Sequence, residues 1–312
     1  MWTGLLPYLG YIAIGLGWQY LKPFQITANL LRRYLNAIIF SILVPAYLLL
    51  FLWQVKFSAH LGRQLLMFLV VVTGMFAVSW LLLHRKKWSG AVKASLILAA
   101  SMPAVFALGM PVVGTTTGTW AVGMAVEFGA LVVLPLMFSL GSLLAYRLAD
   151  KSQPLPPPIM LHEMPAIWAA LAGLVLNVFE IRMPDGFSLW LRQLTDGMLP
   201  LLLITVGTSL IWRKSWNRIA IKLLPLLLIS VFMPPLMIWG MAQVFGVRGP
   251  QTLATMMILS MLPSMALGFT LCERYRLDIV AYNIMFTATT VLALLSIPLL
   301  LAAMGRGWLP LV

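Results

Sequence analysis

Two prolines interrupt a stretch of the chain that is otherwise apolar enough to cross a membrane. The segment SMPAVFALGMPVVG, residues 101–114, carries Pro103 and Pro111 with Gly109 and Gly114 beside them. Proline removes a backbone donor and clashes with the preceding turn, which costs a helix interior about 3 kcal/mol or more. In hydrocarbon, interrupted backbone is tolerated only where it is buried in protein or lines a watery cavity. The segment therefore predicts an interrupted membrane helix inside a bundle.

The scarcity of charge supports lipid as the solvent of this chain. Of its 312 residues, 62% are hydrophobic and only 9% are charged, whereas a soluble domain carries about 25% charged residues. The net charge of +13 comes from Lys and Arg in short connectors between the apolar runs, such as LHRKKW (83–88) and WRKSWNR (212–218). This distribution is typical of membrane proteins and excludes a nucleic-acid-binding surface.

The apolar runs predict an all-α polytopic protein with ten membrane spans. Each run has about the 20 residues that a spanning helix needs, and the runs are too long and too uniformly apolar for barrel strands. The expected spans are 4–21, 34–54, 65–83, 93–113, 119–146, 165–181, 193–212, 222–245, 252–272 and 279–304.

Basic residues alternate between the two sides of this layout. Of the 21 Lys and Arg residues, 15 fall in the connectors after the odd-numbered spans. The excess of positive charge on the cytoplasmic side predicts that both termini lie outside, in a multi-pass protein of the bacterial inner membrane.

The chain divides near its midpoint into two halves of five spans. A Pro-rich cytoplasmic linker, 148–164, separates residues 1–147 from residues 165–312. Proline landmarks recur in the two halves in the same order and at a nearly constant separation: Pro45 with Pro200, Pro103 with Pro263, and Pro135 with Pro298. An odd number of spans per half inverts the second half, which predicts the inverted-repeat architecture of transporters.

Helix breakers occupy equivalent places in spans four and nine. Interrupted helices offer half-helix N-termini, where free N–H groups and the helix dipole attract an anion. A simple kink, with neighbouring helices satisfying the freed carbonyls, is the alternative for each proline. We predict a substrate site at the breakers of the two spans, Pro103, Gly109, Pro111, Pro263 and Gly268.

Glu127 is a carboxyl inside the fifth span. It stands about nine residues into the run, or roughly 13 Å below the membrane surface. A carboxyl at this depth is a candidate for function, and apolar surroundings favour its protonated form, which suits a proton carrier. A permanently protonated group that braces two helices is the alternative.

Hydroxyl and amide side chains are few in the other spans. Thr287, Thr289 and Thr290 form a cluster in span ten, and the repeat relates Thr290 to Glu127. Thr287 and Thr290 join Glu127 as the predicted coupling or polar site, with helix packing as the alternative role. Asn36 and Asn283 lie nearer span ends and are expected at the membrane interface.

At these residues the chain resembles the auxin efflux carrier family, which includes bacterial malonate-type permeases and is related to plant PIN auxin carriers. The resemblance covers the whole chain. It rests on LNAIIFSILVPAYLL (35–49), LGMPVV (108–113), MPAIWAALAGLVLNVFEIRMP (164–184), GMLPLLLITVGTSL (197–210), MLPSMALGFTLCERYRLD (261–278) and the stretch 290–298.

The resemblance implies transport of organic anions through two inverted five-span repeats, with spans four and nine crossing as in the related sodium–bile acid symporters. It adds Ala104, Ser264 and Leu267 to the substrate site. Family members often carry Asn where this chain has Ala104 and Leu267. The amides that would orient a carboxylate are absent there, which indicates an apolar or differently held ligand.

We therefore expect a secondary active transporter of a small organic anion, either a carboxylate or a lipophilic acid, working by alternating access. The coupling ion is either a proton or a sodium ion, and the protein is either a monomer or a homodimer. No cofactor or metal is expected, because Cys272 is the only cysteine and the three histidines lie in separate connectors. A sensor or passive channel on a transporter-like scaffold, and a membrane-embedded enzyme, are the alternatives.

Overall fold

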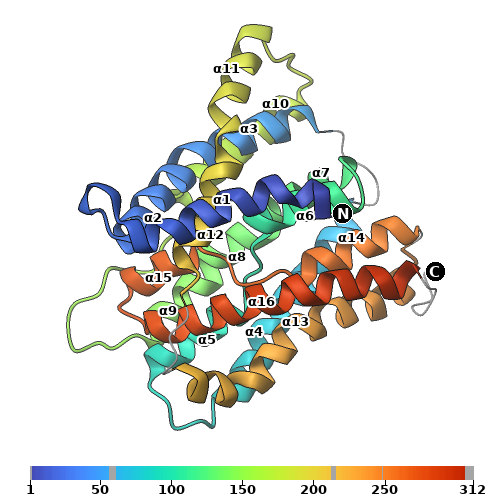
Figure 1. The fold of residues 1–312 in the computed structure, drawn as a ribbon. Coiled ribbons are helices and arrows are strands. Elements are labelled where there is room, and N and C mark those ends of the chain that lie inside the picture. Colours follow the sequence, from blue (N-terminus) through green and yellow to red (C-terminus); the bar gives the residue numbers. More distant parts are fainter. Residues whose placement is uncertain (1, 56–60, 212–215, 248, 306–312) are drawn as a thin grey trace.

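Helices make up the fold over the residues that the structure describes, 2–55, 61–211, 216–247 and 249–305. Figure 1 shows this computed structural model. Within the described residues no strand occurs beyond a single bridge between Pro103 and Ser264, so the all-helical prediction is confirmed. Five helical stretches in this part of the chain are long and apolar enough to cross a membrane: Ala28–Gln54, Leu61–Leu83, Trp120–Leu148, Ile219–Phe245 and Ile279–Ala303.

One group of helices, which we call the scaffold bundle, joins segments from both halves of the chain. Helix α1 packs along α12, α3 packs along α10, and α2 and α11 complete the group, which lies on one side of the molecule in Figure 1. Its members are α1 (Trp2–Leu21), α2 (Ala28–Ile38), the π-helical turn η2 (Ile39–Leu43), α3 (Val44–Gln54), α10 (Pro165–Val178), α11 (Asp185–Asp196) and α12 (Met198–Ser209).

The remaining long helices, together with the short helices and turns between them, form a second group, which we call the crossing bundle. Helix α5 packs against α4 and α16, and α13 packs against α4, α14 and α16. Its members are α4 (Leu61–Leu83), α5 (Gly90–Ser101), η3 (Val105–Gly109), α6 (Met110–Thr116), α7 (Trp120–Phe128), η4 (Gly129–Val133), α8 (Leu134–Leu136), η5 (Met137–Gly141), α9 (Ser142–Leu148), α13 (Asn217–Phe245), α14 (Pro250–Ser260), α15 (Gly268–Arg274) and α16 (Ile279–Gly305). Short 3₁₀ turns, η1 (Pro23–Gln25) and η6 (Leu161–Glu163), lie in the connectors.

Three prolines are accommodated by π-helical turns that come just before them. Pro45, Pro111 and Pro135 follow η2, η3 and η4, and the residue before each proline donates its N–H to the carbonyl five residues back. The wider turn relieves the clash between the proline ring and the preceding turn. These prolines therefore bend their helices without ending them, so Pro111 is no breaker, although the sequence analysis predicted one.

Two of the differences between the helix boundaries and the expected spans have a local cause in the sequence. The run 193–212 is divided at Gly197 into α11 and α12, because polar residues gather at the end of α11 and the glycine begins a new helix. The run 34–54 starts earlier, at Ala28, where the Thr27 hydroxyl accepts a hydrogen bond from the N–H of Leu30 (3.3 Å). The basic connector at 212–218 lies mostly outside the described residues.

Candidate functional site

The first interruption follows α5 at the sequence Met102–Pro103–Ala104. Helix α5 ends at Ser101, Met102 takes an extended conformation, and the helix resumes at Val105. The expected interruption at Pro103 is therefore present. All the residues from Ser101 to Ala107 are buried, so the freed backbone groups must find partners inside the protein.

The second interruption is longer and follows α14. That helix ends at Ser260, and the chain runs through 261–267 before α15 begins at Gly268. This stretch contains Pro263, as expected, and every one of its residues is buried. The first N–H groups of α15 are already bonded to the carbonyls of residues 265–267, at 2.9–3.2 Å. The free half-helix N–H groups expected there to hold an anion are therefore not free in this structure.

The two interruptions meet and satisfy one another's backbone. The N–H of Ala104 donates to the carbonyl of Pro263 (2.7 Å), and the N–H of Met265 donates to the carbonyl of Met102 (2.9 Å). These two hydrogen bonds pair Pro103 with Ser264 in an isolated antiparallel β-bridge. Because each stretch supplies the donors and acceptors that the other lacks, neither interruption could be buried alone. We call this contact the crossing.

The Ser264 side chain completes the pairing. Pro103 has no N–H to offer the carbonyl four residues back, which is that of Ala99, and the Ser264 hydroxyl donates to this carbonyl instead (2.5 Å). The N–H of Ser264 donates to the Thr289 hydroxyl oxygen (3.2 Å), and the two hydroxyl oxygens lie 3.1 Å apart. Ser264 and Thr289 thus connect the two interrupted helices to α16.

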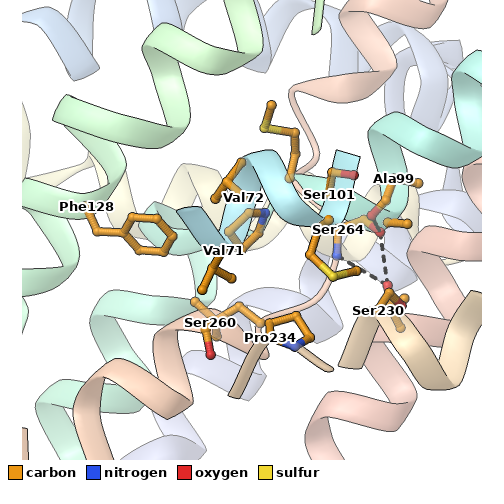
Figure 2. Close-up of a pocket in the computed structure, with 15 residues that line it drawn as sticks. Val71, Val72, Ala99, Ser101, Phe128, Ser230, Pro234, Ser260 and Ser264 are labelled. Carbon is orange, nitrogen blue, oxygen red and sulfur yellow. Dashed lines mark hydrogen bonds between the residues drawn. The ribbon is translucent and has the colours of Figure 1, made fainter. Parts of the chain in front are cut away.

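A small cavity with a mixed polar and apolar lining lies beside the crossing. Its volume of about 20 Å³ suffices for about one water molecule. Figure 2 shows Val71, Val72 and Phe128 on one side of it and Ser101 and Ser264 on the other. Buried hydroxyls line it, and that of Ser101 has no hydrogen-bond partner among the described residues. The lining hydroxyls are those of Ser101, Ser230, Ser260, Ser264 and Thr289.

An apolar cavity lies against the same crossing residues. Its volume is about 10 Å³, and Ala104 and Leu267 both line it. The two positions at which the resemblance implies Asn in related carriers are thus brought to one apolar surface. The other lining residues are Phe40, Phe106, Ala107, Leu202, Met265 and Ala266. Both cavities are too small to hold an organic anion in this structure.

The structure gathers most of the predicted substrate residues at the crossing. Pro103, Ala104, Pro263, Ser264 and Leu267 form the pairing or line the cavities beside it.

The remaining three predicted substrate residues lie next to the crossing. Gly268 follows it directly, and the Tyr282 ring packs onto its Cα. Gly109 packs against Leu262 and Leu259 of the second interrupted segment, and Pro111 is buried at the start of α6. Whether any of these residues contacts cargo stays a prediction.

The predicted coupling residues are not brought together. Glu127 is half-buried on α7, one residue before the cavity-lining Phe128, and has no hydrogen bond or ion pair among the described residues. Thr287 donates to the carbonyl of Ile211 (3.1 Å), and Thr290 donates within its own helix to that of Phe286 (2.7 Å). Thr289 is the threonine of the cluster that reaches the crossing.

Several polar groups around the crossing were not predicted from the sequence. Two of these groups are the hydroxyls of Ser101 and Ser260, which are the last residues of α5 and α14, the helices that lead into the two interruptions. A serine before each proline, in SMP and SMLP, is the signal that could have found them.

Asn36 and Asn283 are both buried inside the protein, and their expected depth at the membrane interface stays a prediction. The Asn36 amide lies 3.5 Å from the carbonyl oxygen of Ala266, and Asn283 donates to the carbonyl of Ser209 (3.1 Å). Both carbonyls lie where a helix is broken or ends, so they need donors from neighbouring helices.

Comparison with known proteins relates the sequence of this chain to one protein family. A family model described as membrane transport protein matches residues 10–301. No curated protein matches the chain.

Proposed function

The chain belongs to the membrane transport protein family, which contains the auxin efflux carriers, and from this membership we propose a secondary active transporter of a small organic anion. The observation that carries the proposal is the crossing, in which two interrupted helices exchange the hydrogen bonds from Ala104 to Pro263 and from Met265 to Met102. Transporter sites are typically built where discontinuous helices of two repeats meet. The family is one of transporters and not of enzymes.

The packing of the helices supports two inverted repeats of five spans, residues 1–147 and 165–312, joined by the linker 148–164. If the first half is laid on the second, α1 corresponds to α10 and α3 to α12. The contact of α1 with α12 then corresponds to the contact of α10 with α3, and both contacts occur. The pair α4 with α5 likewise corresponds to α13 with α14, which also pack together. A two-fold relation between the halves accounts for these paired contacts.

Alternating access follows if the scaffold bundle and the crossing bundle move against each other. The cavities of about 20 and 10 Å³ beside the crossing are too small for an organic anion, so cargo enters only when packed surfaces separate. Relative movement of two bundles around a fixed site is the usual solution in transporters of this kind. Both termini would face the outside of the bacterial inner membrane, as the basic connectors predict.

Gradient-driven accumulation tests the proposal. The purified protein is placed in proteoliposomes, and uptake of radiolabelled weak organic acids is followed under an imposed proton or sodium gradient. A transporter accumulates one of these anions above its external concentration and above the level in protein-free liposomes, in which a proton gradient alone traps a weak acid. A passive channel only equilibrates it, and a sensor does not move it, so either result would refute the proposal.

Glu127→Gln is predicted to remove proton-driven accumulation. The amide cannot bind or release the proton that a half-buried carboxyl would carry, so the accumulation ratio should fall to about one, while exchange of cargo without a gradient continues. Glu163→Gln, at an exposed carboxyl of the linker, is the matched control and should accumulate normally. Unchanged accumulation by Glu127→Gln would exclude Glu127 as the proton carrier.

A further inference from the structure

Arg32 is a buried cation that is only partly paired. Its side chain is 2% exposed, and Nη2 lies 2.9 Å from Oε1 of Glu273, a residue that is 29% exposed. The guanidinium carbon lies 4.2 Å from the ring centre of Phe269. The Nη1 group has no hydrogen-bond partner among the described residues. A single contact leaves unused the two-pronged geometry with which arginine binds a carboxylate.

Asn36 follows one helical turn after Arg32 and is also incompletely paired. Its Nδ2 reaches the Ala266 carbonyl and the Thr270 hydroxyl only at 3.5 Å each, and its buried Oδ1 accepts from no donor in the part of the chain that the structure describes. Contacts of this length are at the limit of a hydrogen bond. The amide is therefore free to turn toward a better partner.

Phe40 follows one further turn along the same face and lines the apolar cavity with Ala104 and Leu267. Residues 32, 36 and 40 are spaced by four and share one side of the helix. At 1.5 Å per residue, the stripe is about 12 Å long from Arg32 to Phe40. It begins with a cation, continues with an amide and ends on apolar surface.

We propose that this stripe is the binding site of a lipophilic monocarboxylate, with the carboxylate on Arg32 and Asn36 and the apolar body in an enlarged cavity against Ala104 and Leu267. The inference rests on the proposed function and specifies its cargo. It also accounts for the missing amides at the crossing, because the polar groups come from α2 instead. A cargo with a charge at each end would be rejected, since its second charge would meet only apolar side chains.

Glu273 occupies the place of the cargo carboxylate in the closed conformation. A buried guanidinium without a counter-charge is strongly disfavoured, so Glu273 holds Arg32 until a carboxylate replaces it. The pair joins α2 of the scaffold bundle to α15 of the crossing bundle. Exchange of partners on Arg32 therefore releases one bundle from the other as cargo binds.

Ligand-dependent melting of the purified full chain tests this site. The probes are 4-phenylbutanoate, its neutral amide 4-phenylbutanamide, and the dicarboxylate adipate, each titrated to give an apparent Kd from the shift in melting temperature. The variants are Arg32→Gln and Glu273→Gln. Arg33→Gln is the matched control, because Arg33 is the adjacent residue and is exposed.

We expect only 4-phenylbutanoate to bind the parent protein and Arg33→Gln, with equal Kd. Arg32→Gln should weaken this binding by about tenfold or more, the loss typical of a charge-assisted hydrogen bond. Glu273→Gln should strengthen it several-fold, because the competing carboxylate is gone. This opposite effect would not arise if the ion pair were only structural, and it decides the question if Arg32→Gln does not fold.

Three results would overturn the inference: equal binding by Arg32→Gln, equal binding of the neutral amide, or weaker binding by Glu273→Gln. No binding of 4-phenylbutanoate by the parent protein would overturn it as well. Uptake separates this failure from failure of the proposed function. A parent protein that accumulates another organic anion remains a transporter, whereas one that accumulates none is not.

Discussion

Alanine at Gly268 is expected to destabilise the protein by about 1–3 kcal/mol and to abolish uptake. A Cβ at this position would overlap the hydroxyl and ring of Tyr282, with Cε2 at 2.6 Å. Tyr282 cannot move aside, because it is fully buried, its hydroxyl donates to the Met265 carbonyl (2.5 Å), and its ring packs edge-on against Phe269. The added methyl would therefore push α16 away from the crossing. Melting temperature in detergent and uptake into proteoliposomes measure the two effects.

Two controls identify Tyr282 as the cause. Gly240 is a helical glycine at which an added Cβ would meet no tertiary neighbour within 4 Å in the described part of the chain. Gly240→Ala should therefore leave stability unchanged or slightly raised. In a Tyr282→Ala background, Gly268→Ala should cost much less, because the overlapping ring is gone. An equal cost in both backgrounds would show that another contact is responsible.

Gly15→Ala is expected to destabilise the scaffold bundle strongly, at the upper end of about 1–3 kcal/mol or beyond. A Cβ on Gly15 would overlap the carbonyl oxygen of Ile204 and lie 2.8 Å from the Cα of Gly207. The clash is with backbone, which no side-chain rotation can relieve. Close approach of helices through small residues is a main source of packing in membranes. The variant should melt at a lower temperature and elute partly as aggregate.

Gly10→Ala is the matched control on the same helix, because a Cβ added at Gly10 would meet no tertiary neighbour within 4 Å among the described residues. It should melt at or slightly above the temperature of the parent protein. Equal destabilisation of the two variants would point to a general loss of flexibility in α1, and would contradict the packing of α1 on α12.

The interruptions could be predicted from sequence because proline acts on its own backbone in any surroundings. Pro103 and Pro263 each remove an N–H and clash with the preceding turn, and in an apolar run the consequence is a buried gap. Pro111 shows the limit of this reasoning. A π-helical turn before it absorbs the clash, and nothing in the local sequence distinguishes a bend from a break.

The partners at the crossing could not be predicted, because they depend on how distant helices meet. The Ser264 hydroxyl bonds to a carbonyl 165 residues away, and Arg32 pairs with Glu273 across 241 residues. Arg32 lies between the first two expected spans, where the sequence indicates only a connector charge. A rotation of about 100° per residue decides which threonine of the cluster faces the crossing, so Thr289 could not be distinguished from Thr287 and Thr290 by sequence.

Access to the crossing from both sides of the membrane is the central claim of this account. Cys272 is the only cysteine, so Cys272→Ser gives a background in which a single cysteine can be placed at Ala104, which is 2% exposed and lines the apolar cavity. A membrane-impermeant maleimide is applied to right-side-out and inside-out vesicles, with a cysteine at the fully buried Ala125 as the control. We predict that the cysteine at position 104 reacts from either side, at rates that cargo changes, while that at position 125 does not react. Reaction from one side only, or from neither, would contradict alternating access around the crossing.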